Sequence, residues 1–231
     1  MRYQTLATDY DGTLATEGRV PRSTLDALER LKASGRVLIL VTGREMDDLL
    51  TVFPHILLFQ TIVAENGALL YSPASRKARP LAGPPPQAFV EALRRRNVTP
   101  LTVGRSIVAT VRPHDAVVVD VISELALDLQ VVYNKESIMI LPFGVDKGTG
   151  LLAALAELGL SERHTVAVGD GENDQALLDA CEYGVAVANA VPELKERADF
   201  TMPEPEGKGI EQLIELLLLD DLRDVETIIR L

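Results

Sequence analysis

Short apolar runs recur along this chain of 231 residues, and a helical pattern follows most of them. Residues 37–41 are all apolar and branched or leucine, which suits a strand that is buried on both faces. Residues 3–8 and 61–64 are similar runs. Between the first two runs, Ser23 is expected to cap a helix that Gly35 ends. Strands that alternate with helices predict an α/β fold with a doubly wound, Rossmann-like parallel sheet.

The same alternation resumes in the last third of the chain. The expected helices and strands there are helices 147–158, 173–181 and 210–219 and strands 165–168 and 185–188. The two alternating parts are therefore expected to form one core, although they are far apart in the sequence.

A different pattern separates the two parts. Residues 80–86 are rich in proline, which predicts a linker. The segment after it carries short, closely spaced elements, with expected helices at 87–97 and 115–127 and expected strands at 106–111, 131–133 and 138–141. Such spacing suits a small α+β unit. We therefore predict a core made of residues 1–82 and 143–231, with a cap domain of residues 83–142 inserted into it.

Charge and cysteine content restrict the possible partners. The chain has 23 basic and 34 acidic residues, a formal net charge of −11, which argues against binding to a nucleic-acid backbone. The single cysteine, Cys181, excludes an internal disulfide and a cysteine-based zinc site. The sequence shows neither a leader pattern nor an apolar run of 18 residues, so we expect a cytoplasmic protein without a membrane segment. Residues 225–231 have an apolar helical pattern, for which three explanations stay open: the segment packs on the core, it binds a partner, or the chain was cut there from a longer one. The sequence does not predict the oligomeric state.

Acidic residues gather where predicted strands end. Asp9 and Asp11 follow the first strand, and Asp170 and Asp174 follow the strand at 165–168. The carboxyl ends of parallel strands border one crevice, so these carboxylates are expected to lie together. Ionised carboxylates at short range repel each other unless a cation separates them, and a set of oxygen ligands favours Mg²⁺.

Hydrogen-bond donors are expected at the same edge. Thr42 and Gly43 follow the strand at 37–41, and Lys147 opens the helix at 147–158. Donors beside a metal can hold a phosphoryl group, and a carboxylate there can attack it. The combination predicts phosphoryl transfer.

Other chemistries fit the sequence less well. A calcium loop that begins at Asp170 would need glycine and glutamate where Gln175 and Cys181 stand. The three histidines lie far apart without metal-ligand spacing, and the chain has no Gly-x-Ser-x-Gly nucleophile elbow.

The chain resembles the haloacid dehalogenase (HAD) superfamily of phosphatases. The four segments that carry the resemblance, in order, are residues 9–13 (DYDGT), residues 42–44 (TGR), Lys147 and residues 169–174 (GDGEND). Residues 64–68 (AENGA) and 146–148 (DKG) are typical of the Cof-type branch, whose cap is inserted between the second and third motifs. The resemblance covers essentially the whole chain, and the length and small cap look most like archaeal-type phosphoglycolate phosphatases.

The resemblance implies a role for each acidic residue. Asp9 would be the nucleophile that forms an aspartyl-phosphate, and also a metal ligand. Asp11 would be the general acid and base, and would bind Mg²⁺ through its backbone carbonyl. Asp170 would ligate the metal, with Asp174 at or just behind the coordination shell. The residues implied to bind the phosphoryl group are Thr42, Gly43, Lys147 and Asn173.

The leading prediction is Mg²⁺-dependent hydrolysis of a small soluble phosphomonoester, either phosphoglycolate or a sugar phosphate. A phosphomutase is the alternative enzyme, because it shares the aspartyl-phosphate. A receiver-like signalling domain is the non-enzyme alternative, although receivers are about half this length and lack the second acidic residue. Arg105, Arg112 and Lys135 lie near predicted strand ends in the cap and are expected to bind an acidic leaving group.

Overall fold

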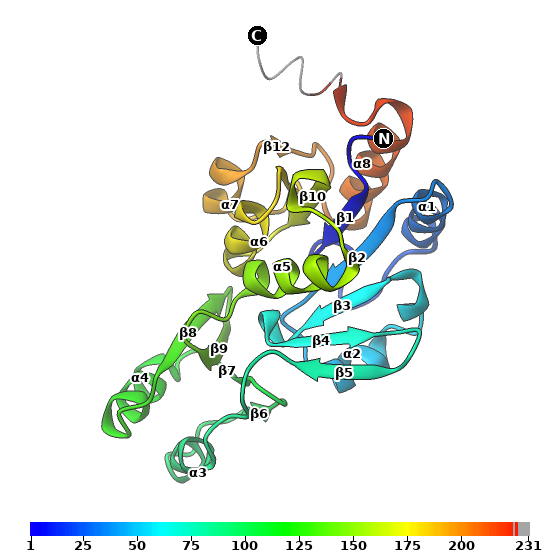
Figure 1. The fold of residues 1–231 in the computed structure, drawn as a ribbon. Helices are drawn as coiled ribbons and strands as arrows, with labels where there is room; N and C mark the ends of the chain where they lie inside the picture. The colour runs from blue at the N-terminus through cyan, green and yellow to red at the C-terminus, as the bar shows by residue number, and fades with distance from the viewer. Residues whose placement is uncertain (224, 226–231) are drawn as a thin grey trace.

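The structure is a computed structural model that describes residues 1–223 and 225 of the chain. Within that part, the larger sheet has eight strands in the order β12-β11-β10-β1-β2-β3-β4-β5 (Figure 1). Its strands are β1 (Thr5–Thr8), β2 (Val37–Val41), β3 (Thr61–Ala64), β4 (Leu69–Ser72), β5 (Lys77–Pro80), β10 (Thr165–Gly169), β11 (Tyr183–Ala186) and β12 (Phe200–Thr201). The strands from β12 to β3 run parallel, and their side chains are almost all buried, which confirms the predicted α/β class.

Helices cover both faces of this sheet. They are α1 (Arg22–Ala33), α2 (Met46–Val52), α5 (Lys147–Leu158), α6 (Gln175–Asp179), α7 (Pro192–Arg197) and α8 (Glu206–Asp220), with short 3-10 helices η1 (Ile56–Leu58), η2 (Glu65–Gly67), η3 (Glu162–His164) and η4 (Glu172–Asp174). In Figure 1, α5 crosses in front of the sheet, whereas α1 and α8 pack against each other on the other side. No helix in the described residues is long and apolar enough to cross a membrane.

Two expectations about this core need correction. The sheet is mixed, because β4 and β5 form an antiparallel hairpin at one edge, where no strand was predicted. Ser23 does not cap α1, which begins at Arg22 after the extended residue Pro21. The Ser23 hydroxyl instead donates to Glu211 of α8 at 2.6 Å, and so joins two helices. Gly35 does follow the last turn of α1, with a φ of 91° that favours glycine.

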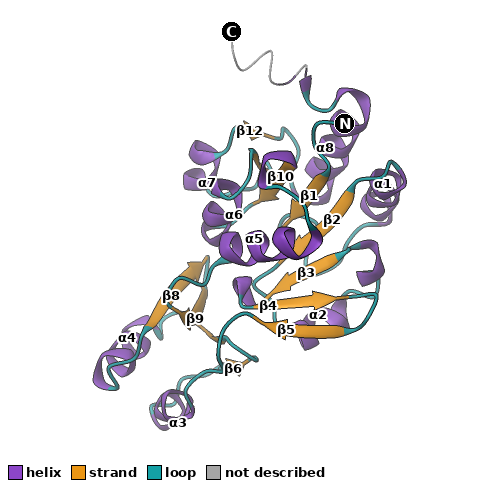
Figure 2. Cartoon of the chain, viewed as in Figure 1, coloured by secondary structure: helices purple, strands orange, loops and turns teal. Residues whose placement is uncertain are grey.

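The second sheet has the order β6-β7-β9-β8 and lies between β5 and α5 in the sequence. The elements of this small module are α3 (Gln87–Arg95), β6 (Thr102–Val103), β7 (Val108–Val111), α4 (Asp115–Glu124), β8 (Leu129–Asn134) and β9 (Ser137–Pro142). Figure 2 shows α3 and α4 on the side of this sheet that faces away from the core. Two chain segments join it to the larger sheet, one at the predicted proline-rich linker and the other at residues 143–146.

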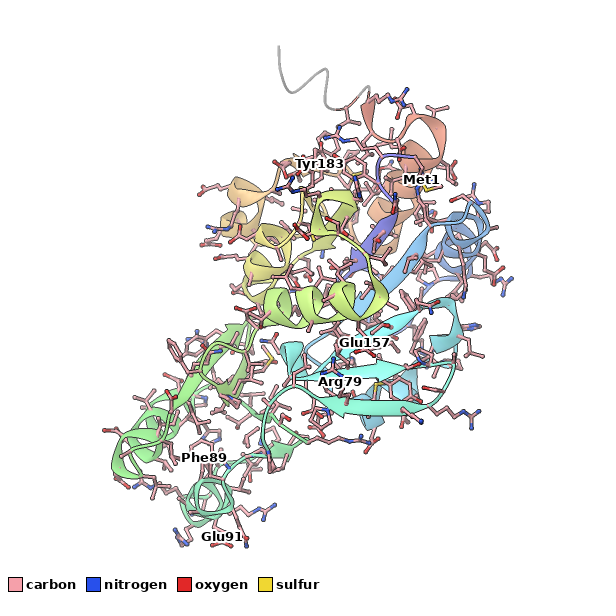
Figure 3. The ribbon with its side chains drawn as sticks, in the orientation of Figure 1. Met1, Arg79, Phe89, Glu91, Glu157 and Tyr183 are labelled. Atoms are coloured by element: carbon pink, nitrogen blue, oxygen red, sulfur yellow. The ribbon has the colours of Figure 1, made fainter. Side chains whose placement is uncertain are left out.

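Successive side chains of β9 point to opposite faces of the small sheet, and the two faces pack against different partners. Ile138 and Ile140 pack with residues of α3 and α4, including Phe89, in a separate apolar cluster. Figure 3 places Phe89 on the inner side of α3 and Glu91 on its outer side. Met139 and Leu141 point the other way and pack with Ala68 of the core. The small module therefore lies with one sheet face against the core.

The predicted apolar pattern at 225–231 lies outside the described residues except for Val225, which is buried.

Candidate active site

Three buried carboxylates meet where β1 and β10 end. The two strands are parallel neighbours, so Asp9, which follows β1, and Asp170, which follows β10, are brought to the same edge. Asp174, at the end of η4, completes the group, and one oxygen from each carboxylate lies within 4.8 Å of the others. All three residues are at most 4% exposed. The structure thus brings together three of the four carboxylates expected at this edge, whereas the side chain of the fourth, Asp11, is turned toward Arg44.

Lys147 compensates this charge from the first turn of α5. The helix begins there because Asp146 caps it, accepting from the Thr149 backbone N–H at 2.7 Å. The Lys147 Nζ lies 2.6 Å from Asp9 Oδ1 and 2.5 Å from Asp174 Oδ1. The lysine is itself only 1% exposed, so the ion pairs are shielded from water.

Burial sets the proton affinities of this group. Burial raises the pKa of Asp9 to about 8, and the carboxylates of Asp174 and Asp170 add to the shift, while Lys147 opposes it. Burial alone would lower the pKa of Lys147, but the carboxylates of Asp174 and Asp9 outweigh it and raise that pKa. The single positive charge of Lys147 does not neutralise three carboxylates. The site therefore favours the binding of a further cation.

Asp174 differs from the other two carboxylates in its partners. Its Oδ1 faces Lys147, and its Oδ2 accepts from the backbone N–H groups of Asp170 (3.0 Å) and Gly171 (2.9 Å). Both oxygens are thus engaged within the chain. This bonding orients Lys147 and the turn that carries Asp170.

Asp11 lies outside the buried cluster. Its carboxylate is held by Arg44, with Nε to Oδ2 at 2.6 Å and Nη2 to Oδ1 at 2.8 Å. The Asp11 side chain is 42% exposed, so it sits at the mouth of the site, where a leaving group or a water molecule could reach it. Arg44 belongs to the Thr-Gly-Arg segment, of which only Thr42 and Gly43 were predicted to bind the phosphoryl group.

The residues expected to bind phosphate form a second group beside β2. Thr42 is buried and its hydroxyl accepts from the Arg44 backbone N–H at 3.1 Å. A Cβ on Gly43 would lie 3.7 Å from Asn173 Nδ2, so the two predicted residues are neighbours. Asn173 Nδ2 donates to Asn66 Oδ1 at 2.9 Å, whereas the buried Asn173 Oδ1 has no hydrogen-bond partner among the described residues. Asn66 lies in the segment 64–68 that is typical of the Cof-type branch, and the structure shows that it also contacts this site.

The small module reaches into the same site through the turn between β8 and β9. The Lys135 Nζ lies 2.6 Å from Asp170 Oδ2, and the Lys135 backbone N–H donates to Glu172 at 3.0 Å. A Cβ on Gly171 would meet Asn134 Oδ1 at 2.3 Å, and one on Gly43 would meet the Met139 sulfur at 3.2 Å. The turn therefore covers the acidic cluster.

The three basic residues predicted to bind a leaving group are placed differently. Lys135 contacts the cluster, as described above. Arg105 lies 3.7 Å from Asp47, at the surface between the small module and α2. Arg112 stacks over the ring of Tyr133 at 5.1 Å, within the small module.

A profile of the haloacid dehalogenase-like hydrolases matches residues 6–104 and 122–214 of the chain. The chain belongs to this family. It is 29% identical over 225 residues to the phosphoglycolate phosphatase of Methanothermobacter thermautotrophicus, which covers 90% of this chain and 96% of that protein. It is 40% identical over 99 residues to phosphoglycolate phosphatase 2 of Saccharolobus solfataricus, a match that spans 43% of this chain and 42% of that protein.

Solved structures share the fold. A HAD/COF-like hydrolase from Plasmodium vivax superposes with a TM-score of 0.80 at 19% identity, covering 94% of this chain and 96% of that one. The family match shows that this chain is an enzyme of the hydrolase class, and the relatives that it matches are named phosphatases.

Proposed function

We propose that the chain is a Mg²⁺-dependent hydrolase of small phosphomonoesters that works through an aspartyl-phosphate on Asp9. The observation that carries this proposal is the buried convergence of Asp9, Asp170 and Asp174 on Lys147. Enzymes catalyse phosphoryl transfer mainly by positioning the reactants and by stabilising charge in the transition state. This site brings together the charged groups that such catalysis needs.

The acidic cluster suits a magnesium ion. Its donors are carboxylate oxygens, which Mg²⁺ prefers. Gly12 leaves room beside them, because a Cβ there would lie 2.4 Å from Asp170 Oδ2. Asp9 and Asp170 would hold the ion with the backbone carbonyl of Asp11, and Asp174 would stand behind them because two backbone N–H groups of the turn already hold its Oδ2. A bound Mg²⁺ supplies charge that stabilises the phosphoryl oxygens.

The chain's own residues then divide the reaction into two displacements. A carboxylate oxygen of Asp9 forms a bond to phosphorus as the ester P–O bond breaks, and Asp11 gives its proton to the departing alcohol oxygen. Asp11 next removes a proton from water, whose oxygen attacks phosphorus as the Asp9–phosphorus bond breaks. Phosphate leaves, Asp9 is again an ionised carboxylate, and Asp11 again carries the proton with which it began.

Four groups fit the transferring phosphoryl group. Lys147 supplies positive charge beside Asp9. Thr42 and the backbone at Gly43 lie at the end of β2, the strand next to β1. The Asn173 amide nitrogen lies beside Gly43 and is oriented by its hydrogen bond to Asn66, so its second N–H can face the same group. Donors that are fixed before the reaction stabilise its transition state without reorganisation.

The small module would act as the cap. The core would consist of residues 1–82 and 143–231, and the cap of residues 83–142, as the sequence pattern predicts. The separate apolar cluster inside the small module supports this division. Its turn over the acidic cluster holds Lys135 beside Asp170, and a lysine there would suit the acidic substrate that the relative's name gives, phosphoglycolate. We therefore favour a carboxylate-bearing substrate such as phosphoglycolate over a neutral sugar phosphate.

Replacing Lys135 by methionine tests this substrate class. We expect kcat/KM for 2-phosphoglycolate to fall about tenfold to hundredfold, the size expected when a charged hydrogen bond of about 1.5–3 kcal/mol is lost. Hydrolysis of p-nitrophenyl phosphate, which carries no carboxylate, should change by less than about threefold. Arg112→Ala is the matched control, because Arg112 stacks on Tyr133 within the same module. Equal losses on both substrates in Lys135→Met would refute the assignment and favour a neutral sugar phosphate.

Metal removal gives a second expected result. Chelator should stop hydrolysis, and Mg²⁺ should restore it better than Ca²⁺, which prefers a looser and larger coordination shell. Mg²⁺ at about one hundred times its Kd should raise Tm by about 5–10 °C, because it binds the folded state alone. Asp170→Asn should lose most of this shift in a thermal melt. Full activity after exhaustive chelation would contradict the metal site.

The proposed reaction is tested by the release of inorganic phosphate from a panel of phosphorylated metabolites with Mg²⁺ present. Rapid, repeated phosphate release supports a phosphatase. Isomerised sugar phosphate without phosphate release would indicate a phosphomutase instead. A single, slow phosphorylation of the protein would indicate a receiver.

We also propose a cytoplasmic location and no nucleic-acid partner, on the grounds of charge and sequence given above.

A further inference from the structure

The acidic cluster is closed in this structure. Asp9, Asp170 and Asp174 are buried, and the turn that carries Asn134 and Lys135 lies over them. The docked small module therefore restricts the access of a phosphorylated substrate to Asp9. The contacts that hold the module in place therefore bear on every catalytic cycle.

One buried side chain of the core holds three backbone groups of the small module. Glu65 Oε1 accepts from the N–H of Arg105 at 3.0 Å, and its Oε2 accepts from the N–H groups of Ser106 (2.7 Å) and Ile107 (3.2 Å). Successive backbone N–H groups that face one anion form a strong, directional site, and the charge on the acceptor strengthens each bond. Glu65 is only 1% exposed, so water does not replace these bonds while the module is docked.

The same turn of chain also contacts the catalytic residues. Next to Glu65, Asn66 accepts from Asn173, one of the proposed phosphate ligands. Gly67 packs so closely against the start of α5 that a Cβ would lie 1.8 Å from the carbonyl oxygen of Asp146, the residue before Lys147. Glu65, Asn66 and Gly67 all have positive φ values, of 53°, 54° and 104°, which is uncommon for the first two. The turn is thus held in one shape between the small module and the phosphate-binding side chains.

We propose that Glu65 is a positioning residue that docks the small module over the active site, and that the turn Glu65–Gly67 couples this docking to the phosphate-binding groups. The inference rests on the proposed function, because it assumes that Asn173 and Lys147 bind the phosphoryl group. Glu65 itself touches no reacting atom. Its effect on catalysis comes from the fraction of molecules in which the module is docked.

Hydrogen exchange in Glu65→Gln tests the docking. Glutamine has the same shape, but its NH₂ group cannot accept a hydrogen bond, so at least one of the bonds from residues 105–107 is lost. We expect these amides to exchange at least about tenfold faster than in the wild type, while amides of β1 and β10 keep their rates. Asp47→Asn is the matched control, because Asp47 faces Arg105 across the same boundary but its side chain is 82% exposed. It should leave exchange within about twofold of the wild type.

A second variant approaches the contact from the other side. Gly104→Ala would place a Cβ 2.9 Å from the Glu65 carboxylate and 2.7 Å from Ile107. It should therefore accelerate exchange at residues 105–107 as Glu65→Gln does, without any change to the core. If exchange at these amides stays within about twofold of the wild type in both variants, the docking role of Glu65 is wrong.

The coupling has its own readout, with inorganic phosphate and Mg²⁺ as the probe. Phosphate should slow exchange at residues 105–107 in the wild type, and by reciprocity Glu65→Gln should raise the inhibition constant of phosphate about tenfold. KM should rise by a similar factor while kcat stays within about threefold. An unchanged inhibition constant despite faster exchange would overturn the coupling. The exchange measurement needs no turnover, so its result is independent of whether the chain hydrolyses phosphomonoesters.

Discussion

Asp9→Asn is expected to lower kcat by at least about 10⁴-fold, the scale of loss seen when an attacking group is removed from a covalent catalyst. An amide is a poor nucleophile toward phosphorus, and it is also a weak ligand for Mg²⁺. The volume of the side chain hardly changes, and the new amide oxygen can still accept from Lys147, so the fold should persist. Steady-state rates measured with Mg²⁺ and 2-phosphoglycolate check the loss, and circular dichroism checks the fold.

Asp26→Asn is the matched control, because it makes the same chemical change at a position outside the active site. Asp26 lies on α1 with its side chain 53% exposed, paired with Arg22. Its replacement should leave the rate within about twofold of the wild type. Asp9→Asn activity within tenfold of the wild type would exclude Asp9 as the nucleophile.

Lys147→Met is expected to cause the largest loss of stability. Removal of one partner from a buried ion pair costs about 3–5 kcal/mol, because the remaining charge is left uncompensated away from water. Here two carboxylates lose their common partner, since Lys147 lies 2.6 Å from Asp9 and 2.5 Å from Asp174. Urea unfolding with chelator present measures the change in the free energy of unfolding.

The matched control is an exposed ion pair between β5 and the same helix. Figure 3 labels Arg79 of β5 and Glu157 of α5, whose side chains meet at 2.7 Å and are each more than half exposed. Arg79→Met should lower the free energy of unfolding by less than about 1 kcal/mol, because solvent screens such pairs. If Lys147→Met costs no more than Arg79→Met, then Lys147 does not stabilise the cluster in the way its burial implies.

The parallel strands of the core were predictable because their side chains are buried on both faces. Residues 37–41 and 61–64 read as continuous apolar runs, and the structure places both as central strands. The hairpin β4–β5 was not predictable in the same way. Its outer strand, Lys77–Pro80, carries charged residues and a proline, as edge strands often do, so it shows no apolar run.

The acidic cluster was predictable because parallel neighbours end at the same edge. Asp9 and Asp170 each follow a buried strand directly, so the pairing of β1 with β10 suffices to bring them together. The partner of Asp11 was not predictable, because the Arg44 side chain crosses from the end of β2, and only its geometry shows which carboxylate it binds.

The contacts between the small module and the core also could not be predicted from the sequence. Lys135 was one of three basic candidates, and nothing in its surroundings in the sequence distinguishes it from Arg105 or Arg112. Its position depends on how the β8–β9 turn docks on the core. Glu65 was part of a segment typical of the family, but its partners are backbone groups about forty residues away, which carry no side-chain signal.

The most direct test of the account is to trap the phosphorylated protein. Enzyme mixed with ³²P-labelled substrate and Mg²⁺ is quenched in acid within one turnover, digested, and mapped by mass spectrometry. The account predicts an acyl-phosphate, labile to hydroxylamine, on the peptide that contains Asp9, and none in Asp9→Asn. Phosphate release without label on that peptide, or label on a different residue, would contradict it.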